Sequence, residues 1–575
     1  MLAYISDYLK LEGLKRSYNF NPDRDFRILS ISSDSRSDLV DKAFIALRGE
    51  RFDGHDFLEH AVNKGARLLI IDEAAEKELN LESASGIPSY LENICILVFS
   101  DTVYALTIIA REYRRTWGGR IVTVTGSVGK TSTRNVIAKS LASSYLVRRT
   151  QKNLNNPIGV SQTLMNMDDE AELAVIELGM DRMGEIFQSA RACEANVAVI
   201  TNIGFSHIEN LGSRENIAKA KFEIAECLSP NSALILNADD DILFQHFLNF
   251  NAEYLLRKNI NKICLCGLCD DNRLEQVRIK AGELVKEYIE VKNNCDELVA
   301  GDVDDFSLSY YTRKTLEHED KLVLLIKKFI FNDKTLNSKV ANAENIQFSI
   351  PHMAEHHLQN LLISFSVARL FDIDDIELER SFQERDNEGN RERLERLGEI
   401  SIFHDYYNAS LESMRASFDS ARLLCPIEEN RVVILACVNE LGSYAEQIHY
   451  EIGKSLFRKF KTKKDRIFLL GAFASSMARA YLDEENLSKN SEDNECANNL
   501  CADIDGNTFL HERVFADKDK LWKALEKRFF EAVEDSDKGI ESVNLDNHSF
   551  FFLIKGSRGY QLETIADKIK EKLEI

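Results

Sequence analysis

Short apolar runs alternate with helix-like stretches through the middle of the chain, between about residues 120 and 246. The helix-like stretch that is clearest covers 131–145. The β-rich apolar runs lie at 120–126, 173–178, 197–203 and 232–238. Alternation of strands and helices in this way predicts a mostly parallel α/β sheet.

Both flanking regions show a similar alternation, which predicts two further α/β units. We therefore expect an N-terminal domain over 1–101, a central domain over 102–388 and a C-terminal domain over 389–575. Two segments, 270–345 and 483–507, are charged or polar with little clear periodicity, and we interpret them as insertions without an assigned function.

Composition fits a globular protein and excludes some partners. The chain has 575 residues, 44% of them hydrophobic, and a formal net charge of −22. Such an acidic chain is not expected to bind nucleic acid, since phosphate-backbone binding needs a basic surface. The N-terminus carries acidic residues within its apolar run and does not resemble a signal peptide, and no apolar stretch is long enough to span a membrane. The 11 cysteines then suggest reduced thiols in the cytoplasm.

A phosphate-binding loop follows the strand at 120–126. The glycines turn the backbone amides toward an anion, the lysine contributes charge to the β- and γ-phosphates, and the threonine hydroxyl suits Mg²⁺. Val124 stands where the first glycine of the general pattern would be. The nucleotide-binding residues expected here are Thr125, Gly126, Ser127, Val128, Gly129, Lys130, Thr131 and Ser132.

Lys221 lies on the apolar face of a predicted helix that begins after Ser213. Ile217, Ile224 and Leu228 share one face, and Lys221 falls in the middle of that apolar stripe. A lysine there is costly unless it is paired or modified, although it can also extend past the stripe to water. Burial would lower its pKa and make the neutral amine available for chemistry.

Polar residues also follow two of the predicted strands. Glu177 ends the run at 173–178, and His207 follows the run at 197–203. Ligands of open α/β sheets bind beyond the carboxyl ends of the strands. Both side chains are therefore candidate Mg²⁺ ligands, although each taken singly could be structural.

Several blocks of the chain, in order, resemble the Mur ligase family. The segment around the phosphate loop, 122–137, resembles its ATP loop. The blocks at 151–164, 174–186 and 201–224 resemble the branch that adds D-alanyl-D-alanine. The segments 32–36 and 44–57 look like the UDP-binding first domain, and those at 404–414, 438–449 and 554–559 look like the third domain.

The resemblance implies a three-domain Mur ligase architecture: a UDP-substrate-binding domain, a central P-loop ATPase domain with a parallel sheet, and a Rossmann-like C-terminal ligase domain. It implies a cytoplasmic, monomeric enzyme that uses ATP and Mg²⁺ to join D-alanyl-D-alanine to UDP-MurNAc-tripeptide in peptidoglycan synthesis. An acyl phosphate would be the intermediate, and its charge calls for cations in the site.

The resemblance also implies roles for individual residues. Lys130, Glu177, His207 and Lys221 would be catalytic, and Thr131, Glu177, His207 and a carbamylated Lys221 would hold metal. Further nucleotide contacts would come from Asn360, Arg393, Asp405, Tyr407 and Asn408. Substrate contacts would come from Asp34, Ser35, Arg36, Gly49, Asp53, His55, Asn155, Asn156, Lys555, Ser557 and Arg558.

The chain departs from the family pattern at a few positions. His404 stands where the first of two acids is usual, and Glu355 replaces an arginine before the adenine block. Two alternatives therefore stay open. One is a sibling ligase that adds another amino acid, and the other is a silent homologue that binds the nucleotide precursor.

Overall fold

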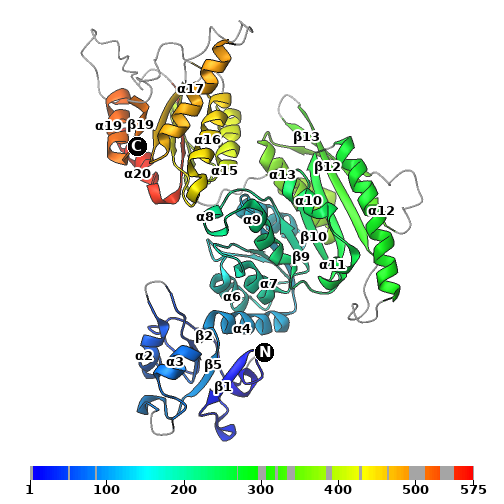
Figure 1. The fold of residues 1–575 in the computed structure, drawn as a ribbon, viewed down its shortest axis with the longest axis vertical. Helices are drawn as coiled ribbons and strands as arrows, with labels where there is room; N and C mark the ends of the chain where they lie inside the picture. The colour runs from blue at the N-terminus through cyan, green and yellow to red at the C-terminus, as the bar shows by residue number, and fades with distance from the viewer. Residues whose placement is uncertain are drawn as a thin grey trace.

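Three β-sheets divide the chain into N-terminal, central and C-terminal domains, with the central domain lying between the other two (Figure 1). The expectation of an α/β chain with largely parallel sheets is confirmed. The computed structural model describes residues 4–49, 52–83, 87–268, 270–294, 306–317, 321–332, 344–383, 391–425, 430–462, 465–490, 512–530 and 549–573.

The N-terminal sheet has five strands in the order β1-β5-β4-β3-β2, of which only β1 is antiparallel to its neighbour. The short strands follow from short apolar runs, and β3, β4 and β5 are fully buried. The elements are α1 (Ile5–Tyr8), β1 (Leu14–Tyr18), β2 (Ile31–Ser32), β3 (Ala43–Ile45), α2 (Leu58–Asn63), β4 (Leu68–Asp72), α3 (Glu73–Glu78) and β5 (Cys95–Phe99).

The central sheet has nine strands in the order β14-β13-β12-β11-β10-β9-β6-β8-β7. All pairs from β7 to β12 are parallel, and β12, β13 and β14 pair antiparallel. Its strands are β6 (Arg120–Thr125), β7 (Val147–Arg149), β8 (Leu173–Glu177), β9 (Val197–Ile200), β10 (Ser232–Asn237), β11 (Ile260–Leu268), β12 (Ser307–Glu317), β13 (Leu322–Phe331) and β14 (Glu344–Ile350).

Helices cover this sheet, and the predicted strand and helix positions around the phosphate loop are confirmed. The helices are α4 (Thr102–Trp117), α5 (Lys130–Leu141), α6 (Pro157–Met165), α7 (Glu185–Cys193), α8 (Ile208–Leu211), α9 (Arg214–Phe222), α10 (Asp241–Leu248), α11 (Ala252–Arg257), α12 (Asp271–Asn294), α13 (Glu355–Leu370) and α14 (Asp375–Gln383). The carboxyl ends of the neighbouring strands β8, β6 and β9 therefore bring Glu177, the phosphate loop and the segment before His207 to one edge.

The segment 270–345 is more regular than the sequence suggested. Its described parts form α12 and the strands β12 and β13, which extend the central sheet. Helix α12 buries Val277, Ala281, Leu284 and Tyr288 at spacings of four, three and four residues. That helical stripe is present in the sequence, but the many charges between its members obscured it.

The C-terminal sheet has the order β15-β16-β20-β17-β18-β19, parallel except for the β15–β16 hairpin. Its elements are β15 (Arg393–Leu397), β16 (Ile400–Asp405), α15 (Leu411–Leu424), β17 (Asn430–Ala436), α16 (Ala445–Lys459), β18 (Asp465–Leu470), α17 (Ala474–Asn490), β19 (Val514–Phe515), α19 (Lys518–Phe529), β20 (Phe550–Lys555) and α20 (Glu563–Lys572). Most of the polar segment 483–507 lies outside the described residues.

Among the helices that the structure describes, none combines the length and the apolar character needed to cross a membrane.

Candidate active site

A large cleft lies between the central and C-terminal domains, with a volume of about 980 Å³. Its central-domain wall includes the phosphate loop, Glu177, His207, Lys221 and Asn360. Its C-terminal wall includes Asp405, Tyr407, Asn408, Lys555 and Arg558. Residues expected to act in one site, although distant in sequence, therefore surround one cavity.

The phosphate loop is held in shape by the segment after β9. Gly126 has a φ of 155°, and a Cβ at this position would lie 1.9 Å from Thr201 Oγ1, so only glycine fits. The backbone N–H of Val128 donates to Asn202 Oδ1 at 3.0 Å, and Thr201 Oγ1 donates to Val128 O at 2.7 Å. Thr201 and Asn202 are site residues that the loop motif alone did not indicate.

Lys130 begins α5 and bends back over the loop. Its Nζ donates to Gly126 O at 2.9 Å and to Ser127 O at 3.3 Å. Burial lowers the pKa of Lys130, and the nearby carboxylate of Glu177 opposes that shift. Backbone carbonyls are weak partners for an ammonium, so Lys130 is available to an anion that enters the loop.

Thr131 and Glu177 meet beside this lysine. Thr131 Oγ1 donates to Glu177 Oε2 at 2.8 Å, and Asn155 Nδ2 donates to Glu177 Oε1 at 2.9 Å. Glu177 is only 2% exposed. A hydroxyl and a carboxylate side by side next to a phosphate loop are the oxygen donors that Mg²⁺ prefers, so this pair fits that ion.

Lys221 is buried, as its position on the apolar stripe predicts, whereas Lys219 is exposed. Ser213 caps the helix α9 by accepting from the N–H of Asn216, as expected. Burial, with a smaller contribution from Lys130, holds the pKa of Lys221 well below its usual range. Among the described residues, Lys221 has no hydrogen-bond or ion-pair partner, and burial disfavours the charged form of its amine at the cleft wall.

His207 lies at the N-terminus of α8, where its Nδ1 faces two carboxylates. The nitrogen is 2.9 Å from Glu440 Oε2 and 3.2 Å from Asp181 Oδ1. It is nevertheless buried without a well-aligned hydrogen bond to either. An imidazole nitrogen and carboxylate oxygens can both ligate a divalent cation, so His207 also fits a metal-binding role.

A buried ion pair supports the C-terminal wall. Lys555 Nζ lies 2.6 Å from Asp405 Oδ2, and the lysine side chain is 1% exposed. Tyr407 follows in the same loop, with the guanidinium of Arg391 4.3 Å from its ring centroid and that of Arg558 5.5 Å away. Cationic groups of the C-terminal domain thus face the phosphate loop across the cleft.

Arg393 does not line the cleft. It pairs across 3.0 Å with Glu395, and its side chain is 45% exposed. Arg391, two residues earlier, is the arginine of this segment that lines the cavity. Strand β15 begins at Arg393, so a difference of two residues decides whether the side chain belongs to the hairpin or to the cleft.

Two departures from the family pattern have structural explanations. His404 is fully buried, and its Nε2 contacts Glu395 Oε2 at 2.7 Å, away from the cleft lining. Burial lowers the pKa of His404. Glu355 forms an ion pair with Arg313 of β12, and both line the cleft. Arg313 of β12 therefore supplies a positive charge next to the position where the family usually has an arginine.

Asn360 and Asn156 occupy different environments. Asn360 lines the cleft and accepts a hydrogen bond from Thr133 Oγ1 at 3.0 Å. Asn156 is exposed and caps α6, where its Oδ1 accepts from the N–H of Gly159 at 2.8 Å. Asn155 therefore faces the cavity, while Asn156 shapes the loop that carries it.

The residues expected to bind UDP lie in the N-terminal domain, outside the cleft. Asp34 and Arg36 form an exposed ion pair after β2, and Arg36 lowers the pKa of Asp34 to about 2. Asp53 Oδ1 lies 2.6 Å from His55 Nδ1. Ser35 is buried beside the first pair, and Gly49 donates to Phe52 O in the second loop. The two loops follow adjacent parallel strands, so both lie at the same edge of the sheet.

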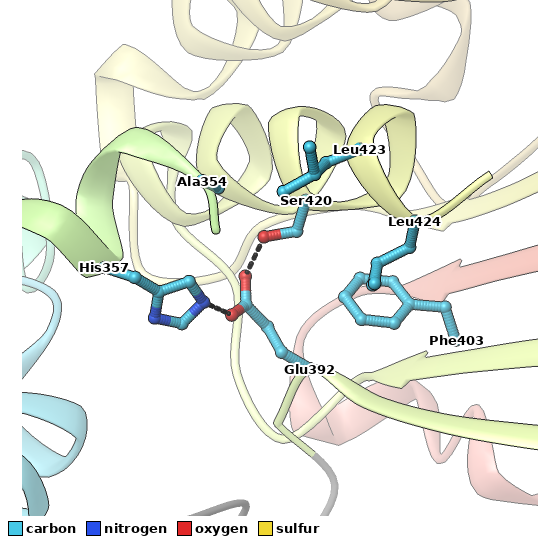
Figure 2. Close-up of a pocket in the computed structure, with 7 residues that line it drawn as sticks. All are labelled: Ala354, His357, Glu392, Phe403, Ser420, Leu423 and Leu424. Atoms are coloured by element: carbon cyan, nitrogen blue, oxygen red, sulfur yellow. Dashed lines mark hydrogen bonds and ion pairs between the residues drawn. The ribbon is translucent and has the colours of Figure 1, made fainter. Parts of the chain in front are cut away.

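A small cluster of polar side chains links the central and C-terminal domains (Figure 2). His357 Nε2 lies 2.6 Å from Glu392 Oε2, and His356 Nε2 lies 3.1 Å from Glu392 Oε1. Ser420 donates to the same carboxylate at 2.9 Å. Burial alone would raise the pKa of Glu392, but the two histidines hold it well below its usual range.

Glu392→Gln is expected to loosen this contact, costing about 1–3 kcal/mol of local stability because the buried hydroxyl of Ser420 and the half-buried imidazoles of His356 and His357 lose a charged partner. Hydrogen exchange of α13 and β15 measures the effect. Since the pKa of Glu392 is depressed in the folded chain, the contribution of its carboxylate to stability is fully present above the ordinary carboxyl pKa of about 4.3. This contribution is lost as the pH falls through the pKa that Glu392 has in the folded chain. Glu377→Gln, at an exposed pair with Arg380, serves as the control. Equal exchange in the two variants would contradict the role of Glu392.

Comparisons with known proteins agree with this arrangement. The family model of the Mur ligase middle domain matches residues 124–368, and that of the Mur ligase family catalytic domain matches 27–98. The UDP-N-acetylmuramoyl-tripeptide–D-alanyl-D-alanine ligase of Bacillus subtilis is 29% identical over 80% of this chain and 84% of its own length. That of Rickettsia prowazekii is 25% identical over 91% of each chain. The chain belongs to the Mur ligase family.

Solved structures confirm the fold of this Mur ligase. The crystal structure of MurF from Acinetobacter baumannii has a TM-score of 0.65 at 22% identity, covering 95% of this chain and 94% of that one. The MurF ligase from Thermotoga maritima in complex with ADP has a TM-score of 0.62 at 20% identity, covering 95% and 98%. The predicted three-domain Mur ligase architecture is therefore confirmed.

Proposed function

We propose that this Mur ligase joins D-alanyl-D-alanine to UDP-MurNAc-tripeptide and converts ATP to ADP and phosphate. The relatives of similar length carry this activity in their names. The observation that carries the proposal is one cleft lined by Lys130, Glu177, His207 and the buried Lys221. Such a cluster is suited to phosphoryl transfer, where positioning and charge stabilisation dominate catalysis.

The reaction has two steps. An oxygen of the tripeptide carboxylate attacks the γ-phosphorus of ATP, and ADP leaves. The amine of the dipeptide then attacks the acyl carbon of the acyl phosphate, loses a proton, and phosphate leaves with the electron pair of the broken C–O bond. Lys130 and the loop amides bind the phosphates, while Arg391 and Arg558 approach from the C-terminal domain.

Mg²⁺ would neutralise phosphate charge in this site, with Thr131 and Glu177 as its ligands. Lys221 is proposed to carry a carbamate, because a buried, neutral and unpaired amine is the form that reacts with carbon dioxide. The two loops of the N-terminal domain would bind the UDP moiety. We also propose a cytoplasmic monomer; the described cysteines form no disulfide, which fits a reducing compartment.

Phosphate release by the purified chain tests the proposal. With ATP and Mg²⁺, release is expected only when UDP-MurNAc-tripeptide and D-alanyl-D-alanine are both present, with the pentapeptide product identified by mass. Release with another amine would identify a sibling ligase. ATP binding without release would contradict the enzymatic function and favour a silent homologue.

A further inference from the structure

The helix α15 of the C-terminal domain begins against the central domain, beside the segment that shapes the phosphate loop (Figure 1). Glu412 lies in the first turn of this helix and lines the cleft. Its Oε1 accepts a hydrogen bond from the backbone N–H of Phe205 at 3.2 Å. Glu412 is not among the site residues expected from the sequence, so this contact between two domains is visible only in the folded chain.

A short series of contacts connects Glu412 to the phosphate loop. A Cβ at Gly204 would lie 2.5 Å from Cδ of Glu412, so the carboxylate rests directly on this part of the backbone. The N–H of Gly204 donates to Ser127 Oγ at 2.8 Å, and Ser206 Oγ donates to Ser127 O at 3.3 Å. Gly204, Phe205 and Ser206 therefore lie between an acid of one domain and the phosphate loop of the other.

The charge of Glu412 is not neutralised by a neighbouring cation. Among the described residues it forms no ion pair, and its Oε2 is buried without a hydrogen-bond partner. Arg415, three residues later on the same helix, instead donates to Ser455 Oγ at 3.0 Å and pairs with Glu451 at 3.6 Å. An unpaired carboxylate beside a phosphate site repels the phosphate. The contact through which Glu412 can assist the site is therefore its hydrogen bond to Phe205.

We propose that Glu412 is a positioning residue of the ATP site, which holds residues 204–206 against the phosphate loop from the C-terminal domain. Loss of its side chain would let the N–H of Gly204 move away from Ser127, and the loop amides would then be less well aligned with a phosphate. The inference rests on the proposed function in that ATP occupies this loop. It adds that the shape of the loop depends on the position of the C-terminal domain.

Nucleotide binding to the full-length chain tests this role, because it requires no ligase substrate. Isothermal titration calorimetry would measure the affinity for adenylyl imidodiphosphate with Mg²⁺, an ATP analogue that is not hydrolysed. Glu412→Ala is expected to bind about tenfold more weakly than the wild type, the factor that corresponds to losing one hydrogen bond to a charged group. Glu412→Gln keeps an oxygen for the N–H of Phe205 and loses the repulsive charge, so its affinity should stay within a few-fold of the wild type.

Glu446→Ala is the matched control, because this exposed acid also lies in the first turn of a C-terminal helix, α16, but outside the cleft lining. It should bind the analogue like the wild type, which separates the loss of a first-turn carboxylate as such from the loss of the contact. Equal affinity in the wild type and Glu412→Ala would overturn the inference. Equal losses in Glu412→Ala and Glu412→Gln would also overturn it, since the hydrogen bond would then not be what matters.

A double-mutant cycle with Ser127→Ala distinguishes positioning through residues 204–206 from a general structural effect. Ser127→Ala removes the oxygen that accepts the N–H of Gly204. If Glu412 acts through this segment, the double variant should lose less affinity than the product of the two single losses. Losses that multiply would overturn the inference, even if the wild type is an active ligase. Conversely, the expected pattern would support the inference even if the wild type released no phosphate with the proposed substrates.

Discussion

Lys221→Ala is expected to reduce turnover by a factor of about 10²–10³ or more while ATP binding persists. The variant removes the one lysine of α9 that lies at the cleft wall, 2% exposed. ATP contacts from the phosphate loop remain, so nucleotide affinity should change little. Phosphate release and a separate ADP-binding titration measure the two effects.

The physical reason is the charge that the modified lysine would supply. The neutral nitrogen attacks carbon dioxide and gives a proton to solvent, which leaves a carbamate anion in place of the neutral amine. Burial, which depresses the pKa of Lys221, favours the neutral amine that this reaction needs. A small carboxylate such as acetate should enter the space vacated in Lys221→Ala and restore part of the rate.

Lys219→Ala provides the matched control, because Lys219 lies on the same helix but faces solvent. It should retain close to wild-type turnover. A Lys221→Ala enzyme with near wild-type rate would contradict the carbamate role, and so would a low rate that no small carboxylate improves. Incorporation of ¹³C-labelled carbon dioxide, followed by nuclear magnetic resonance, gives an independent readout of the modification.

The contrast between these two lysines illustrates what sequence periodicity can predict. Helical spacing placed Lys221 on the apolar face and Lys219 opposite it, and both placements are confirmed. Glu177 could be placed similarly, because it ends a buried strand of a parallel sheet whose carboxyl edge carries the phosphate loop. These inferences need only local periodicity and the rule for ligand sites in α/β sheets.

Contacts between domains could not be predicted in this way. Glu440 lies more than 230 residues from His207 in sequence, and no local pattern says which loops of two domains will meet. Glu392 and Arg391 directly follow a connection between domains, where neither strand nor helix periodicity fixes the direction of a side chain. The assignment of Arg393 to the phosphates rested on the motif alone and had no such geometric support.

Arg391→Ala is accordingly expected to lower kcat by a factor of about 10²–10³, the range for losing a group that stabilises charge in the transition state. Arg391 lines the cleft beside Tyr407, and its charge acts on Lys130, whose pKa is lowered by burial and, to a lesser extent, by this guanidinium. Steady-state kinetics with ATP as the varied substrate would measure the loss.

Arg393→Ala should remain within a few-fold of the wild type, because its partner Glu395 is also held by Lys570 at 2.8 Å and by His404. An exposed ion pair of this kind contributes little to stability, about 0–1 kcal/mol. The reverse result, with Arg393→Ala inactive and Arg391→Ala normal, would mean that β15 shifts by two residues when nucleotide binds. Comparing the two variants therefore tests whether the cleft described here is the one in which catalysis occurs.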